Sequence, residues 1–74
     1  MVYGEITMKI SVRNQLAGTV KEVTLGAVMA EVIVQVGDNK VVSAITKDAV
    51  EDLALKAGDK VTVLVKSTSV MIQK

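Results

Sequence analysis

Hydrogen-bond donors and two permanent positive charges stand out among the residues of this chain that could do chemistry. Ser11 and Arg13 lie two positions apart in a segment predicted to be extended, so their side chains should share one face. Lys66 and Ser67 lie at the end of another predicted strand, and Thr46 precedes a predicted helix. The start of a helix attracts anions through free backbone N–H groups and the positive end of its dipole. Gathered around one point, these groups would bind a tetrahedral dianion without a metal or a catalyst.

Each of these residues also has a purely structural interpretation. Ser11 and Arg13 are typical of an exposed strand face, Lys66 of an ordinary surface lysine, and Thr46 of a helix cap whose hydroxyl accepts from a backbone N–H. Spacing alone does not show that the groups converge. The residues by themselves therefore favour an anion site on a small β barrel and leave its assembly open.

Residue types needed for most enzyme chemistry are missing. The sequence has no histidine and no cysteine, which excludes a thiol nucleophile, a Ser–His pair and a zinc-bound water. Its eight carboxylates are scattered, and its five glycines are isolated and form no phosphate-binding loop. We predict that the protein is not an enzyme and has no metal or catalytic cofactor.

The composition points to a small protein that assembles with copies of itself. The chain of 74 residues is one domain, and a core of that size is marginal without disulfides, metals or subunit contacts. The net charge of +1 and the single aromatic residue, Tyr3, argue against binding nucleic acid. The first residues lack the basic and apolar regions of a signal peptide, so we expect a cytoplasmic protein.

Alternating apolar and polar residues predict six short strands. These are residues 8–12, 16–25 with a bulge or bend at Lys21-Glu22, 27–36, 40–45, 60–66 and 70–72. Two sets of alternate residues are predicted to form the apolar faces of their strands: Val28, Ala30, Val32, Val34 and Val36 in the first, and Val61, Val63 and Val65, facing inward, in the second. A hairpin turn is predicted at Gly37-Asp38-Asn39, and another turn at Ala57-Gly58-Asp59. One amphipathic helix is predicted over residues 47–55, with an apolar stripe formed by Ala49, Val50, Leu53 and Ala54. This order predicts an all-β fold, a small OB-like Greek-key barrel of five or six strands with one short helix.

Residues 11–20, with the sequence SVRNQLAGTV, resemble the opening signature of the molbindin, or Mop, family. This family is related to the TOBE domains of molybdate transport ATPases. The resemblance continues through Gly26, residues 30–32 and 44–46, and residues 65–68, and it covers nearly all of residues 8–74. It therefore implies a single Mop domain over 8–74, preceded by an extension, residues 1–7, to which no role is assigned.

The resemblance implies a function. Molbindins are OB-like barrels that assemble as homohexamers, trimers of dimers, and store or buffer molybdate or tungstate bound at subunit interfaces. Carried over by position, Ser11 and Arg13 would come from one subunit, and Thr46, Lys66 and Ser67 from its neighbour. Backbone N–H groups near Ala44 to Lys47 and Ala49 would add to the shell, and Arg13 and Lys66 would offset the charge of the dianion.

The chain departs from the family pattern at Ala49, and the sequence leaves more than one function open. The family often has a hydroxyl residue where this chain has Ala49, so either one donor is lost or the backbone N–H serves instead. Losing one hydrogen bond of about 0.5–1.5 kcal/mol would weaken binding about tenfold without abolishing it. A different class of function, an OB-type interaction module for nucleic acid or a protein partner, stays open. The sequence does not decide between molybdate and tungstate, or between storage and sensing. It also leaves open the affinity and the number of sites.

Overall fold

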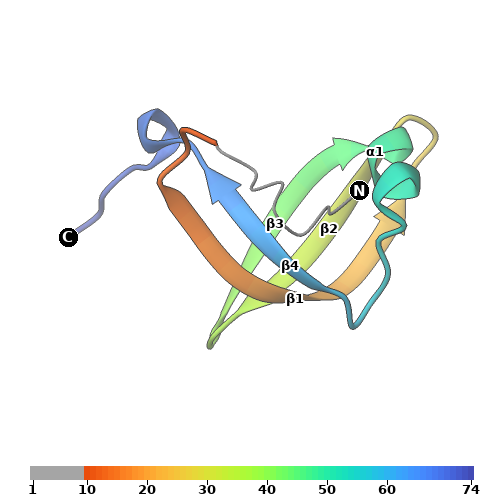
Figure 1. The fold of residues 1–74 in the computed structure, drawn as a ribbon, viewed down its shortest axis with the longest axis horizontal. Coiled ribbons are helices and arrows are strands. Elements are labelled where there is room, and N and C mark those ends of the chain that lie inside the picture. Colours follow the sequence, from red (N-terminus) through yellow and green to blue (C-terminus); the bar gives the residue numbers. More distant parts are fainter. Residues whose placement is uncertain (1–9) are drawn as a thin grey trace, which may run out of the picture.

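The computed structural model describes residues 10–74, which form a four-stranded antiparallel sheet and one short helix (Figure 1). The elements are β1 (Asn14–Leu25), β2 (Met29–Val36), β3 (Asn39–Thr46), α1 (Lys47–Leu53), β4 (Lys60–Val65) and a 3₁₀ turn, η1 (Ser67–Ser69). The strand order in the sheet is β3-β2-β1-β4, so β3 and β4 are its two edges. The all-β class with one short helix is confirmed.

The long strand β1 is shared between two partners. Its first half pairs with β4, from Asn14 opposite Val65 to Thr19 opposite Lys60, and its second half pairs with β2 up to Leu25 opposite Ala30. A shift of register between Val20 and Glu22 confirms the predicted bulge, and the strand is strongly bent (Figure 1). Because β2 leaves β1 near its middle, the first half of β1 has β4 as its only partner strand within residues 10–74.

A glycine in β1 allows this strand to pass close to β2 where the two strands diverge. A Cβ atom on Gly18 would lie 2.6 Å from Val34 Cγ1 and 2.7 Å from the Gln35 carbonyl oxygen. Neither distance is tolerable for a methyl group, and the second contact is with backbone, which cannot turn away. Glycine is therefore the residue type that this close approach of β1 to β2 requires at position 18.

The core consists of small apolar residues, three of them at alternate positions of β2. The buried residues are Val20, Ala30, Val32, Val34 and Val50. Val61 and Val63 of β4 pack against them and are half-buried, which confirms the predicted inward face of that strand. The predicted inward face of the segment 27–36 is also correct from Ala30 to Val36, but Val28 lies before β2 and its side chain is 71% exposed.

The predicted hairpin turn and helix start are confirmed. Gly37, with a φ of +58°, and Asp38 connect β2 to β3. Thr46 caps α1, and its side chain accepts a hydrogen bond from the Ala49 N–H at 3.1 Å. The predicted end of the helix is wrong, because α1 stops at Leu53.

Ala54 ends α1 in the left-handed conformation, with a φ of +50°. Its N–H bonds back to the Glu51 carbonyl, and the chain leaves the helix axis there. The predicted apolar stripe is consequently only partly right: Val50 is buried, whereas Leu53 is 66% exposed.

The end regions differ from the sequence prediction. Of the predicted strand 8–12, residues 8 and 9 lie outside the described residues, and Ile10, Ser11 and Val12 form no strand. The predicted last strand, 70–72, is not formed either, and Met71 and Ile72 are fully exposed. Residues 10–74 thus contain four strands and not the predicted five or six.

Replacing Ala54 with glycine is expected to stabilise the fold. Glycine adopts a positive φ without the steric cost that a Cβ atom brings, which should raise the free energy of unfolding by about 0.5–1 kcal/mol. The midpoint of urea unfolding measures this. Ala57→Gly, at an exposed turn residue without a positive φ, is the matched control and should not raise the midpoint.

Candidate functional site

Four of the predicted site residues lie together at one end of the sheet, where β1 begins and β4 ends. We call Ser11, Arg13, Lys66 and Ser67 the arginine cluster. Asn14 is paired with Val65, so Arg13 and Lys66 directly flank the last pair of this ladder. All four residues are exposed. The segment before β1 and the turn η1 lie at the same end of the molecule (Figure 1). Two cationic side chains and two hydroxyls thus share one exposed end of the sheet.

The other four predicted residues lie where β3 passes into α1. We call Ala44, Thr46, Lys47 and Ala49 the threonine cluster. The hydroxyl of Thr46 accepts a hydrogen bond from Ala49, but a hydroxyl has one proton to donate in addition to its lone pairs. Thr46 is exposed, so the same side chain can cap the helix and donate to an anion.

Two backbone donors predicted for the site are already used inside the chain. The Lys47 N–H donates to the Val28 carbonyl at 2.8 Å, and the Ala49 N–H donates to Thr46 Oγ1. In an antiparallel ladder, successive residues direct their N–H groups alternately toward and away from the partner strand. The Lys47 bond to Val28 sets this alternation along β3, which pairs with β2 without a shift of register.

The alternation leaves Ala44 and Thr46 with backbone N–H groups that face the open edge of the sheet. Ile45, between them, is directed toward β2. The outward donors of the threonine cluster are therefore the N–H groups of Ala44 and Thr46 and the hydroxyl of Thr46. The N–H of Thr46 lies within the predicted range 44–47, but its outward direction could not be predicted from the sequence, because it depends on the strand register.

The two clusters lie at opposite ends of one chain. Thr46 is paired with Met29 beside the end of β1, whereas Arg13 precedes its start, and η1 and α1 are at opposite ends of the view in Figure 1. Lys66 and Ser67 are thus grouped with Arg13 and not with Thr46. One anion therefore cannot contact both clusters of the same chain, but two copies could present one cluster each.

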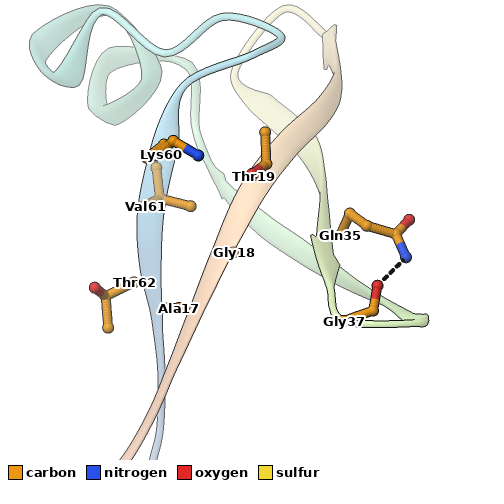
Figure 2. Close-up of a pocket in the computed structure, with 8 residues that line it drawn as sticks. All are labelled: Ala17, Gly18, Thr19, Gln35, Gly37, Lys60, Val61 and Thr62. Atoms are coloured by element: carbon orange, nitrogen blue, oxygen red, sulfur yellow. Dashed lines mark hydrogen bonds between the residues drawn. The ribbon is translucent and has the colours of Figure 1, made fainter.

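A shallow pocket marks the fork where β2 leaves β1, and its lining residues are drawn in Figure 2. Its polar groups do not converge. The Gln35 side-chain amide donates to the Gly37 carbonyl at 2.7 Å, and the side chain of Thr62 points away from β1 (Figure 2). Lys60 is the one charged residue among the lining residues. The fork is therefore a weaker candidate for an anion site than the two clusters.

Comparison with known proteins identifies the family. The TOBE domain profile matches residues 10–72. The chain belongs to the TOBE domain family. It is 50% identical over 66 residues to molybdenum-pterin-binding protein 3 of Clostridium pasteurianum, a match that covers 88% of this chain and 97% of that protein. The predicted membership in the molbindin, or Mop, group of TOBE proteins is thereby confirmed.

Solved structures of Mop proteins have the same fold. A molybdate-binding protein from Sporomusa ovata is 51% identical, with a TM-score of 0.87, and the match covers 90% of this chain and all of that one. MopII from Clostridium pasteurianum is 48% identical, with a TM-score of 0.83 over 89% of this chain and all of that one. The OB-like fold is confirmed, and these relatives are named for binding rather than for catalysis, in agreement with a protein that is not an enzyme.

A further solved relative was crystallised with its ligand. The cytoplasmic molybdate-binding protein ModG, with molybdate bound, is 36% identical with a TM-score of 0.78, and the match covers 89% of this chain and 46% of ModG. In this chain, none of the helices in residues 10–74 is both long enough and apolar enough to cross a membrane.

Proposed function

We propose that this protein binds molybdate at interfaces between copies of itself and holds the ion as a store in the cytoplasm. Two things support this. Two relatives, 50% and 51% identical to this chain, are named as a molybdenum-pterin-binding and a molybdate-binding protein. The predicted donor residues also form two exposed clusters that cannot meet within one chain, and this observation carries the proposal that the site lies between subunits.

The two clusters have complementary roles toward a tetrahedral dianion. Arg13 and Lys66 supply positive charge, and charge-assisted hydrogen bonds are roughly twice as strong as neutral ones. The Ala44 and Thr46 N–H groups and the hydroxyl groups are neutral, and they fix the orientation of the oxygen atoms. Tungstate has the same shape and charge as molybdate, so we propose that it binds to the same donors.

Several surfaces of the chain favour assembly. The β3 edge and the first half of β1 present backbone groups that another chain can pair with. Apolar side chains around the start of β2 are also exposed: Leu25 is 52%, Val28 71% and Met29 49% exposed. Covering them would contribute about 25 cal/mol per Å² of apolar surface. We propose the homohexamer built as a trimer of dimers as the functional assembly.

An interaction module for nucleic acid or a protein partner is the second candidate function. The exposed apolar residues would serve a protein partner as well as a second copy. The single aromatic residue and the net charge of +1 argue against nucleic acid, whose binding depends on positive charge and stacking. Without molybdate binding, this would be the remaining function.

Titration calorimetry with molybdate, tungstate and sulfate tests the proposal, together with the mass of the native assembly. We expect tight binding of molybdate and tungstate, weak binding of sulfate, and a mass of six chains. Binding should also stabilise the folded assembly, by about 2.7 kcal/mol at a free ligand concentration of 100 Kd, which raises the melting temperature. A folded oligomer that gives no heat and no thermal shift with any of the three anions would refute the proposal.

The outward N–H of Ala44 can be removed without breaking the sheet. Ala44→Pro deletes this donor and leaves the bonds of Ile45 and Ser43 to β2 in place, since proline is tolerated on a strand edge. We expect molybdate affinity to fall about tenfold or more, because a hydrogen bond to a charged group contributes roughly 1.5–3 kcal/mol. Val42→Pro removes the preceding outward N–H of the same edge and should keep the affinity.

A further inference from the structure

An apolar groove runs beside β4 and is not used by the proposed anion site. It is lined by Ile10, Gln15, Leu53, Leu55, Asp59, Lys60, Val61, Thr62 and Leu64. Three of its large apolar side chains are exposed to solvent: Ile10 is 49%, Leu53 66% and Leu64 46% exposed. The groove thus extends from the segment before β1, along β4, to the end of α1.

One wall of the groove is an open strand edge. The Val20 N–H donates to the Asp59 carbonyl at 2.8 Å, which sets the alternation of hydrogen bonds between β1 and β4. By that alternation Val61, Val63 and Val65 bond to β1, whereas Thr62 and Leu64 direct their backbone groups outward. Within residues 10–74, β4 has a strand on one side only. An extended segment could therefore pair with Thr62 and Leu64 and place apolar side chains in the groove.

The residues that precede the groove-lining Ile10 in the sequence form a segment of suitable length. Residues 1–9 precede Ile10, which itself lines the groove. Nine extended residues reach about 30 Å, whereas the four steps from Leu64 to Lys60 span about 13 Å. These first nine residues also lie outside the part matched by the TOBE profile, which begins at residue 10.

The sequence of this segment matches the groove in polarity. From Glu5 to Lys9 the segment alternates, with Ile6 and Met8 on one side of an extended chain and Glu5, Thr7 and Lys9 on the other. Met1 and Tyr3 fall on this second side, before the alternation begins. With Ile10 beside Leu64, Met8 would lie beside Thr62, and Ile6, four residues back along the segment, would reach Lys60 at the far end of the groove.

We propose that residues 1–9 dock in this groove of their own chain and add an extended segment to the open edge of β4. The apolar side of the segment covers Leu53, Leu55 and Leu64. Because Ser11 follows Ile10 directly, docking also restrains the start of the arginine cluster.

Cysteine cross-linking tests the proposal in a chain that has no cysteine of its own. The double variant Met8→Cys with Thr62→Cys, a pair that lies side by side in this register, should form a disulfide under mild oxidation, and the product should run as a single chain on a denaturing gel. Met8→Cys with Val42→Cys is the control pair, because Val42 is similarly exposed on β3 but does not line the groove. No disulfide in the first pair, or one that joins two chains, would overturn docking within one chain.

A pair of charge substitutions gives a second measurement. Met8→Asp places a carboxylate on the apolar side of the segment, and Thr7→Asp places the same charge on the polar side. We expect Met8→Asp to lower the urea midpoint and increase the fluorescence of an apolar dye, as deletion of residues 1–7 should, and Thr7→Asp to leave both unchanged. Equal effects of the two substitutions would contradict the proposal. None of these measurements uses an anion, so their failure would not affect the proposed function.

Discussion

Replacing Arg13 with alanine is expected to weaken molybdate binding by about 10- to 150-fold, because a hydrogen bond to a charged group contributes roughly 1.5–3 kcal/mol. Arg13 directly flanks the last pair of the β1–β4 ladder and supplies one of the two positive charges of the arginine cluster. Its side chain is exposed, so the substitution should leave the fold intact. Titration calorimetry gives the affinity, and urea unfolding gives the stability.

Two variants separate the role of Arg13 from a general effect of charge. Lys21→Ala removes the same charge from an exposed position in the bulge of β1, distant from both clusters, and should keep the affinity. Arg13→Lys keeps the charge but loses the planar fork of donors, so it should fall between wild type and Arg13→Ala. Equal losses in Lys21→Ala and Arg13→Ala would mean that only the net charge matters.

Mixing two inactive variants is expected to restore molybdate binding. Arg13→Ala damages the arginine cluster and Thr46→Ala damages the threonine cluster, so each variant alone should bind weakly. After the two chains are unfolded and refolded together, an interface can combine the intact arginine cluster of one chain with the intact threonine cluster of another. Random assembly in equal amounts should give about one intact site in four, counted as high-affinity stoichiometry by calorimetry.

The same mixture distinguishes a site between chains from a site within one chain. If a single chain supplied all the donors, every site in the mixture would carry one defect and no high affinity would return. Thr46→Ser, which keeps both the hydroxyl donor and the acceptor for the Ala49 N–H, is the control that separates loss of the site from loss of the helix cap. Thr46→Ala should also lower stability by about 1 kcal/mol through the lost cap.

Local patterns predicted most of the sheet. Alternating valines predicted the inward faces of β2 and β4, the polar pair at residues 21 and 22 predicted the bulge, and Gly37 predicted the hairpin turn. Residues 70–72 were predicted as a strand from three apolar residues, but a strand also needs a partner, and sequence does not reveal one. The end of α1 was missed because Ala54, an alanine, adopts a positive φ.

The site was predictable as a set of residue types but not as an arrangement. Residue chemistry pointed to Arg13, Thr46 and Lys66, and Thr46 does cap the helix as expected. Which of them lie together depends on the strand order, a non-local property that places Lys66 beside Arg13 and far from Thr46. The direction of the Ala44 and Thr46 N–H groups depends on register in the same way.

The alternation along β3 divides its amide hydrogens into two kinetic classes. Those of Val41, Ser43 and Ile45 are held by β2, so deuterium from the solvent replaces them only when the sheet opens. Those of Val42, Ala44 and Thr46 face outward and exchange freely in an isolated chain. When a second copy or an anion covers this edge, only the second class should slow down. The exchange rates of alternate residues in one strand would thus report separately on folding and on the occupation of the edge.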